Sequence, residues 1–234
     1  MNQYSSLWFK TFLETIPVEQ TEKEIDFLTR VLSHPRYGKV LDLCCGEGRH
    51  SHALAARGYN VTGIDCNESA IEIARTKPGH AQFVVGDMRD VGKLGDTYDA
   101  VICLWQSFGD FDTATNEDVI SQIAHKLGRG GRFVLDIYHR GFFEAHQGTV
   151  TLERPERAVI ERKWMHGDRL TVELEYGEDT GVVDHFERQL FTPDEIVTLG
   201  ARFGLACRVA CTEFDETKAA SSHNPRMQLV FEKK

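Results

Sequence analysis

The N-terminal segment of the chain has apolar residues at helical spacing. Tyr4, Trp8 and Phe12 follow one another at intervals of four residues, and a similar pattern resumes beyond Pro17. Such spacing places apolar side chains on one face of a helix, and the proline interrupts it. We therefore expect residues 1–37 to form a helical cap ahead of the main fold.

Beyond this segment, short apolar runs alternate with helical periods. The runs predict strands at Lys39–Leu43, Asn60–Ile64, Ala81–Val85, Tyr98–Leu104 and Gly131–Ile137. The helical periods between them cover Arg49–Arg57, Glu68–Arg75 and Asn116–Leu127, with Asn67 and Thr115 as predicted N-caps. Apolar strands that alternate with helices indicate an α/β fold with a doubly wound, mostly parallel sheet of the Rossmann-like kind.

Residues 149–191 break this alternation. Leu170, Val172 and Leu174 alternate with polar residues, and two neighbouring stretches alternate more loosely. The pattern predicts an antiparallel meander of three strands inserted into a single domain of residues 1–234. Its apolar face needs a partner, so we expect a lid over an acceptor or a contact between two subunits. After the insertion, Thr192 is the predicted N-cap of a helix, and two further strands follow at Leu205–Glu213 and Met227–Phe231.

Composition narrows the class of protein. Hydrophobic residues make up 41% and charged residues 27%, as in ordinary globular domains. No apolar run reaches the ~18 residues that span a bilayer, and the first residues lack a secretory pattern, so we expect a cytoplasmic protein without a membrane partner. The net charge of −9 argues against a nucleic-acid partner, because phosphate binding favours a basic face.

The six cysteines do not indicate a metal site. Cys44 and Cys45 are adjacent, Cys207 and Cys211 are four apart, and no C-x-x-C pair occurs. Zinc sites need such pairs or regular Cys/His spacing. We expect no metal, and we interpret the cysteines as small buried side chains.

A glycine-rich turn follows the first predicted strand. Asp42 ends that strand, and Gly46 and Gly48 come before the next helix. Such a turn lets a ligand approach the backbone at the start of a helix. The dinucleotide pattern would have a third glycine where Ser51 stands, and the anionic Asp42 would repel a pyrophosphate. The turn therefore favours a ligand with a positively charged centre over NAD.

Two further acids end the next two predicted strands. Asp65 can accept hydrogen bonds from both hydroxyls of a ribose, and Asp87 can accept one from an exocyclic amine. Met88 beside it can pack against a purine. Because the carboxyl ends of parallel strands share one edge, Asp42, Asp65 and Asp87 would form a row there. This row suits a ribonucleoside that carries a positive group.

These segments together resemble the class I S-adenosylmethionine-dependent methyltransferases. The resemblance rests on VLDLCCGEGR, VTGID, VVGDMRD, YDAVICLWQSFGDF and GRGGRFVLDI within residues 38–137, and on an antiparallel last strand ending PRMQLVFEKK. The family's first motif is usually D-x-G-C-G-x-G, and this chain has Cys44 at the first glycine. The resemblance implies S-adenosylmethionine as cosubstrate and methyl transfer as the activity.

The resemblance also implies roles for individual residues. Asp42, Gly46 and Gly48 would line the methionine end of the cosubstrate, Asp65 would bind the ribose, Asp87 the adenine amine, and Met88 the ring. Leu104 and Trp105 would flank the sulfonium. The remaining predicted cofactor contacts are Cys44, Arg49 and Cys66.

The acceptor is expected to be a small molecule methylated on nitrogen or oxygen. The chain has Trp105-Gln106-Ser107-Phe108 where amide- and base-methylating relatives carry an Asn/Asp-Pro-Pro-aromatic motif. In-line transfer needs alignment more than covalent catalysis, and a base would help to deprotonate the acceptor. His139 and His185 are the candidate bases. The predicted acceptor pocket comprises Tyr4, Trp8, Trp105, Phe108 and Tyr138.

Three other functions remain open at this point. A nucleotide-dependent dehydrogenase would bind NAD(P), although Ser51 and Asp42 argue against it. A protein that binds S-adenosylmethionine without catalysis would serve as a partner subunit. A methyltransferase of RNA or protein would need a basic patch beside Trp105.

Overall fold

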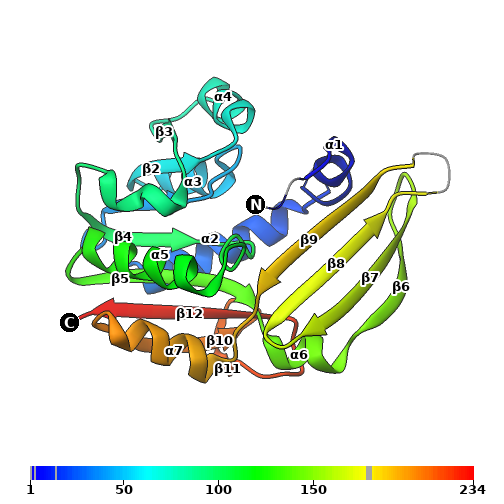
Figure 1. Ribbon diagram of the computed structural model, residues 1–234. Coiled ribbons are helices and arrows are strands. Elements are labelled where there is room, and N and C mark those ends of the chain that lie inside the picture. Colours follow the sequence, from blue (N-terminus) through cyan, green and yellow to red (C-terminus); the bar gives the residue numbers. More distant parts are fainter. Residues whose placement is uncertain (1, 3, 14, 178–180) are drawn as a thin grey trace.

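The computed structural model describes residues 2, 4–13, 15–177 and 181–234, and two sheets organise it (Figure 1). The larger sheet has eight strands in the order β11-β10-β12-β5-β4-β1-β2-β3. In chain order they are β1 Lys39–Leu43, β2 Asn60–Asp65, β3 Gln82–Val85, β4 Tyr98–Cys103, β5 Leu127–Tyr138, β10 Leu205–Thr212, β11 Asp215–Ala219 and β12 Arg226–Lys233.

Strands β1 to β5 are parallel, and the chain crosses over between them. Val40 of β1 pairs with Val61 of β2 on one side and with Ala100 of β4 on the other. Strand β12 lies antiparallel to β5, and β10 lies antiparallel to β12. The predicted Rossmann-like sheet with an antiparallel last strand is confirmed. The short strand β11 adds an edge that the sequence pattern did not indicate.

Helices cover both faces of the large sheet. Helices α2 (Val18–Val31) and α3 (Arg49–Ala55) pack through apolar side chains on one face. Helices α5 (Thr113–Lys126) and α7 (Pro193–Arg202) pack on the other. The remaining connections are α4 (Glu68–Thr76), the 3₁₀ helix η2 (Met88–Lys93) and α6 (Arg140–Ala145).

Side-chain caps set where several helices begin. Asn67 caps α4, and Thr192 forms a capping box with Glu195 at the start of α7, as predicted. The prediction for α5 was wrong, because Asp112 rather than Thr115 accepts the capping hydrogen bond. Both residue types cap well, so only the local backbone decides between them.

The second sheet has four antiparallel strands where three were predicted: β6 Gly148–Glu153, β7 Ala158–His166, β8 Arg169–Glu175 and β9 Val183–Gln189. The additional strand β6 is an edge strand whose side chains are almost all exposed. An exposed edge strand lacks the alternation that marks a half-buried one, which explains why it was missed.

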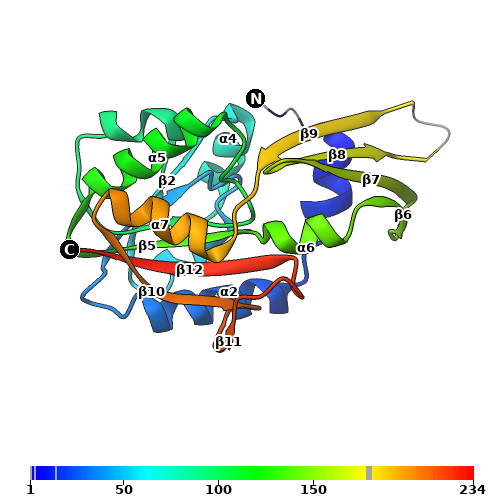
Figure 2. The same ribbon diagram turned by 60° about the horizontal axis from the view of Figure 1, so that its bottom comes forward.

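The N-terminal segment packs against this second sheet. It consists of α1 (Ser6–Trp8) and the π-helix η1 (Phe9–Leu13), and Pro17 then precedes α2. Tyr4 stacks on Phe186 of β9 with ring centroids 4.5 Å apart. Figures 1 and 2 show that the second sheet stands beyond the carboxyl ends of β4 and β5. No helix in the described part of the chain is long and apolar enough to cross a membrane.

Candidate functional site

The glycine turn after β1 is built from residues with positive φ. Cys44, Gly46 and Gly48 have φ angles of 57°, 53° and 77°. A β-carbon at Gly48 would lie 2.6 Å from the ring of Phe83, whereas one at Gly46 would meet no heavy atom within 4 Å. Gly48 is thus required for packing, while Gly46 leaves open space against the turn.

Asp65 at the end of β2 is fixed by this turn. Its Oδ2 accepts the N–H of Gly46 at 2.8 Å, and its Oδ1 accepts the N–H of Asn67 at 2.8 Å. The side chain is half-buried. Each carboxylate oxygen accepts more than one hydrogen bond, so both keep capacity for a pair of hydroxyls. Cys66, the next residue, is exposed.

Asp87 and Met88 lie at the end of β3. Asp87 accepts the N–H of Arg89 at 2.8 Å and pairs with its guanidinium, with Oδ2 2.6 Å from Nη2. The hydrogen bond from the Arg89 side chain lowers the pKa of Asp87. Met88 is buried, and its sulfur lies 3.7 Å from Cys44 Sγ. We call Gly46, Gly48, Asp65, Asp87 and Met88 the glycine-turn site.

Asp42 lies beneath the turn rather than at its opening. Its side chain is 2% exposed, and it accepts a hydrogen bond from Ser51 Oγ at 2.6 Å. Burial raises its pKa. Ser51 stands where the dinucleotide pattern has its third glycine. Its hydrogen bond to Asp42 joins α3 to β1.

Glu24 is a buried carboxylate that the sequence analysis did not single out. It accepts hydrogen bonds from Trp105 Nε1 at 2.7 Å and Arg49 Nη1 at 2.6 Å, and its Oε2 lies 2.7 Å from His50 Nε2. Burial alone would raise its pKa, but the hydrogen bond and charge of His50 and the charge of Arg49 lower it to about 2. Glu24 lies on the same face of α2 as Leu28. An acid on the apolar face of this helix is the feature of the sequence that could have identified Glu24.

Arg49, a predicted cofactor contact, is engaged by this network. Its Nη1 also donates to Thr21 Oγ1 at 2.8 Å, so the guanidinium points toward α2. Arg49 and Arg226 each place their guanidinium carbon 4.9 Å from the centre of the Trp105 ring. The cations that lie against Trp105 are thus two of the protein's own arginines.

The backbone after β4 is held by Asp136 of β5. Leu104 is buried, and the next two residues, Trp105 and Gln106, have φ angles of 58° and 57°. Asp136 is fully buried, and its Oδ2 accepts the Trp105 N–H at 2.9 Å. Its other partners include Arg226 and Gln228 of β12. A non-glycine residue with positive φ is strained, and these bonds offset that strain.

Arg188 of β9 connects three segments at the carboxyl end of β4. It is 9% exposed, its Nη1 donates to Gln106 O at 2.6 Å, and its Nη2 donates to Tyr4 OH at 2.8 Å. Nη2 also lies 3.3 Å from Asp110 Oδ1, and the guanidinium carbon lies 5.6 Å from the centre of the Tyr138 ring. We call Tyr4, Asp110, Tyr138 and Arg188 the Arg188 cluster.

The cluster contains a charged oxygen without a hydrogen bond. Within the described residues, Asp110 Oδ1 is buried and accepts no hydrogen bond, and Arg188 is its ion-pair partner. Burial raises the pKa of Tyr4 to about 12, so its phenol stays neutral at physiological pH. Tyr4 and Tyr138 were predicted acceptor residues. Asp110 and Arg188 were missed, because single charged residues in a loop and an inserted strand carry no spacing signal.

The other predicted acceptor residues have mixed positions. Trp8 lies against Tyr4, with ring centroids 4.4 Å apart, and so borders the cluster. Phe108 is a core residue, 2% exposed and 5.8 Å from the ring of Phe191. The structure therefore brings Tyr4, Trp8 and Tyr138 together and leaves Phe108 in the core.

Within the described residues, neither predicted base forms a hydrogen bond or ion pair with the Arg188 cluster. His139 is buried beside Gly141 and Ser222, burial lowers its pKa, and the charges that act on it come from Glu144 and Arg140. His185 is on the exposed face of β9, with its side chain 57% accessible and Nδ1 3.8 Å from Glu173. A catalytic role for either histidine stays a prediction.

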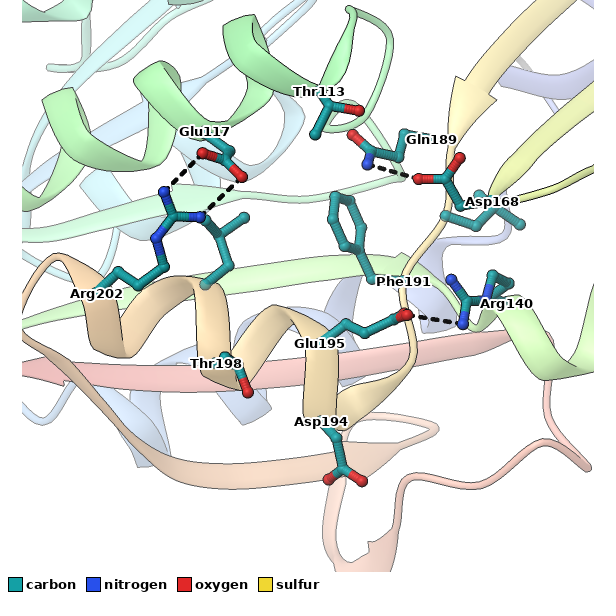
Figure 3. Close-up of a pocket in the computed structure, with 12 residues that line it drawn as sticks. Thr113, Glu117, Arg140, Asp168, Gln189, Phe191, Asp194, Glu195, Thr198 and Arg202 are labelled. Carbon is teal, nitrogen blue, oxygen red and sulfur yellow. Dashed lines mark hydrogen bonds and ion pairs between the residues drawn. The ribbon is translucent and has the colours of Figure 1, made fainter.

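A pocket lies elsewhere, between α5, α7 and the end of β9 (Figure 3). It measures about 370 Å³, and its carboxylates are Glu117, Asp168, Asp194 and Glu195. Its two arginines are already paired, Arg202 with Glu117 at 2.8 Å and Arg140 with Glu195 at 2.7 Å. It shares no residue with the glycine-turn site or the Arg188 cluster. Among the described residues, no group of His, Cys, Asp and Glu is arranged to hold a metal ion.

Comparisons with known proteins find similarity to methyltransferases. A family model described as "Methyltransferase domain" matches residues 40–131. The chain is 28% identical over 166 residues to dTDP-3-amino-3,6-dideoxy-alpha-D-glucopyranose N,N-dimethyltransferase from Streptomyces fradiae, over 68% of this chain and 65% of that protein. It is 30% identical over 122 residues to rat (Rattus norvegicus) glycine N-methyltransferase, over 44% of this chain and 41% of that protein. The chain thus spans less than two thirds of the length of these relatives.

Solved structures extend the likeness across the fold. An S-adenosylmethionine-dependent methyltransferase from Clostridium acetobutylicum superposes with a TM-score of 0.80 at 14% identity, covering 97% of this chain and 96% of that one. An amino pentose methyltransferase from Micromonospora echinaspora, solved with S-adenosylmethionine bound, gives 0.73 at 21% identity, covering 100% and 99%. At these identities the likeness concerns the fold.

Proposed function

Because this chain belongs to the class I S-adenosylmethionine-dependent methyltransferases, we propose that it methylates a nitrogen atom of a small-molecule amine. The family accounts for the glycine-turn site, and the Arg188 cluster supports the choice of acceptor. The reaction breaks the bond between sulfur and the methyl carbon and forms one between nitrogen and that carbon. The products are S-adenosylhomocysteine and the methylated ammonium, which loses a proton to solvent to give the neutral methylated amine.

The residues of the glycine-turn site fit the cosubstrate. Asp65 offers two oxygens with remaining acceptor capacity, held in place by backbone N–H groups. Gly46 leaves room against the turn, and Met88 supplies a buried apolar surface next to Asp87. S-adenosylmethionine, when bound, supplies an electrophilic methyl group on a positively charged sulfur. The protein's contribution on this side is to bind and orient it.

Asp110 supports nitrogen over oxygen as the attacking atom. Positive charge moves onto nitrogen as the new bond forms, and a buried carboxylate nearby stabilises that charge. Asp110 Oδ1 accepts no hydrogen bond within the described residues, so it has capacity to accept one from the acceptor's N–H. The amine attacks as its neutral form and keeps its remaining N–H groups, whereas a hydroxyl acceptor would need a base to remove its proton as it attacks. The name of the Streptomyces fradiae relative, an N,N-dimethyltransferase, is consistent with nitrogen.

The hydrogen bonds made by Arg188 are the main support for a small acceptor. Arg188 links the second sheet to Gln106 after β4 and to Tyr4 of the N-terminal segment. Two segments outside the main fold are thereby held beside the residues that follow β4, where Leu104 and Trp105 were predicted to flank the sulfonium. A site bordered in this way favours a small acceptor over a nucleic acid or a folded protein.

The proposal is tested by measuring S-adenosylhomocysteine release. Purified protein is incubated with S-adenosylmethionine and a panel of small amines, including free and nucleotide-linked amino sugars, and with hydroxyl analogues of the same compounds. We expect release with at least one amine and none with its hydroxyl analogue. Release with RNA or protein substrates alone would contradict the proposal, and so would cosubstrate binding without any release.

A further inference from the structure

A second, smaller pocket lies between η1 and the turn that joins β6 to β7. It measures about 220 Å³ and shares no residue with the glycine-turn site or the Arg188 cluster. Its polar lining residues are Lys10, Thr11, Thr15, Arg154, Glu156 and Arg157. We call it the basic pocket.

The basic pocket is positively charged in an acidic protein. Three cations and one carboxylate line it among the described residues, although the chain has a net charge of −9. Neither Lys10 nor Arg154 has a carboxylate partner within the described part of the chain. The guanidinium of Arg154 lies 5.1 Å from the centre of the Phe12 ring, which holds its position without neutralising it.

Arg157 adds a donor that lacks an acceptor. Its Nε is buried and makes no hydrogen bond within the described residues. Its contact with Glu156 is long, with 3.4 Å between Nη2 and Oε2. A buried N–H group without an acceptor is unfavourable, so such groups are nearly always paired. An anion bound in the pocket close to Nε would supply the missing acceptor.

We propose that the basic pocket binds a phosphate-type oxyanion. Guanidinium groups donate parallel hydrogen bonds to phosphate oxygens, and a lysine adds a point charge beside them. Two arginines and one lysine in a pocket supply this donor set. A single carboxylate, Glu156, opposes it.

The position of the pocket suggests what the oxyanion belongs to. One wall is η1, which continues from the segment carrying Tyr4, and the other is the second sheet, which carries Arg188. If the proposed function holds, a phosphate on the amine acceptor is one source of the oxyanion. Free phosphate acting as an effector is the other source, and the chemistry of binding is the same.

Binding is tested with inorganic pyrophosphate by titration calorimetry, at low and at high sodium chloride. We expect one site per chain that weakens with salt. Arg154→Gln and Arg157→Gln should each weaken it roughly tenfold or more, since each removes a charge-assisted bond. Glu156→Gln should strengthen it, because it removes the opposing charge. Arg162→Gln is the matched control, since Arg162 pairs with Glu175 on the same sheet outside the pocket, and it should leave binding unchanged.

Two results would overturn the site: no pyrophosphate binding, or equal binding in all four variants, which would indicate charge in general. The calorimetry needs no methyl transfer, so it remains decisive if the proposed function fails. With an acceptor in hand, steady-state kinetics separate the two sources. A higher KM with unchanged kcat in Arg154→Gln, with pyrophosphate competing against the acceptor, assigns the oxyanion to the acceptor. A pyrophosphate effect that acceptor does not relieve assigns it to an effector.

Discussion

The glycine-turn site and the Arg188 cluster both lie at the carboxyl ends of the parallel strands of the main sheet, but they are built in different ways. In the glycine-turn site, the backbone N–H groups of Gly46 and Asn67 donate to the Asp65 carboxylate, that of Arg89 donates to Asp87, and that of Gly86 donates to the Asp65 carbonyl. In the Arg188 cluster, side chains come from residues as far apart as Tyr4 and Arg188. The first is specified by φ angles and strand ends, and the second by where whole elements pack.

The difference suggests how each region tolerates change. Positive φ angles, which favour glycine, and the close approach of Phe83 to Gly48 restrict the glycine-turn site to few sequences. A cluster of side chains can exchange members while the strands stay in place, so the acceptor side is free to vary. Glu24 links residues next to the two regions, because it binds Arg49, which follows Gly48, and Trp105, which precedes the Gln106 carbonyl bound by Arg188.

The largest expected effect is on the glycine-turn site itself. Gly48→Ala combines a positive φ with a β-carbon 2.6 Å from Phe83, and we expect a loss of about 3 to 4 kcal/mol in unfolding free energy. Gly58→Ala is the matched control, because Gly58 has φ of 91° and open space around its β-carbon position. It should lose only about 1 kcal/mol. Equal losses in urea denaturation would mean that the Phe83 contact relaxes freely.

Glu24→Gln tests the joint between the regions. The lowered pKa of Glu24 means that its charge stabilises the fold above its unfolded value of 4.5, and that this contribution disappears as the pH falls toward about 2. We expect the variant to lose about 3 kcal/mol at pH 7 and to approach the wild type near pH 2 to 3. Urea denaturation across this range measures it. A constant difference at every pH would exclude the charge as the cause.

Asp65→Ala should disable the glycine-turn site without affecting the Arg188 cluster. It removes both hydrogen-bonding oxygens, and we expect affinity for S-adenosylhomocysteine to fall roughly a hundredfold in calorimetry. Asp90→Ala is a suitable control, since Asp90 is an exposed acid paired with Lys93 nearby. Unchanged affinity in Asp65→Ala would defeat the ribose assignment.

Asp110→Asn makes the complementary test on the acceptor side. Removing the charge should lower kcat roughly tenfold, while cosubstrate affinity stays within a factor of about two. His139→Ala, examined in parallel, decides whether the predicted base contributes. If His139→Ala slows turnover and Asp110→Asn does not, the acceptor side has been assigned to the wrong residue.

His185→Ala should have the smallest effect. Its imidazole lies on the exposed face of β9, whereas Arg188 lies on the buried face of the same strand. We expect kcat and KM to stay within about twofold of the wild type. A marked loss of turnover would show that the outer face of the second sheet takes part in the reaction.

Periodicity predicted most of the main fold because each signal is local. Every parallel strand and its order along the chain followed from apolar runs between helices, and Thr192 was a correct N-cap. Errors arose where local chemistry was ambiguous. Asp112 and Thr115 are both good caps, and β6 is an exposed edge without alternation.

By itself, the sequence determined the Rossmann-like sheet, the glycine turn and the position of Asp65 and Asp87 at the ends of β2 and β3. These features depend on φ preferences and on periodicity, which act over a few residues. Tertiary structure alone decided that Asp42 is buried, that Glu24 holds Arg49 and Trp105, and that Arg188 meets Tyr4 and Asp110. Those contacts join residues up to 184 positions apart. No pattern within a short window encodes them, because packing of whole elements brings the side chains together.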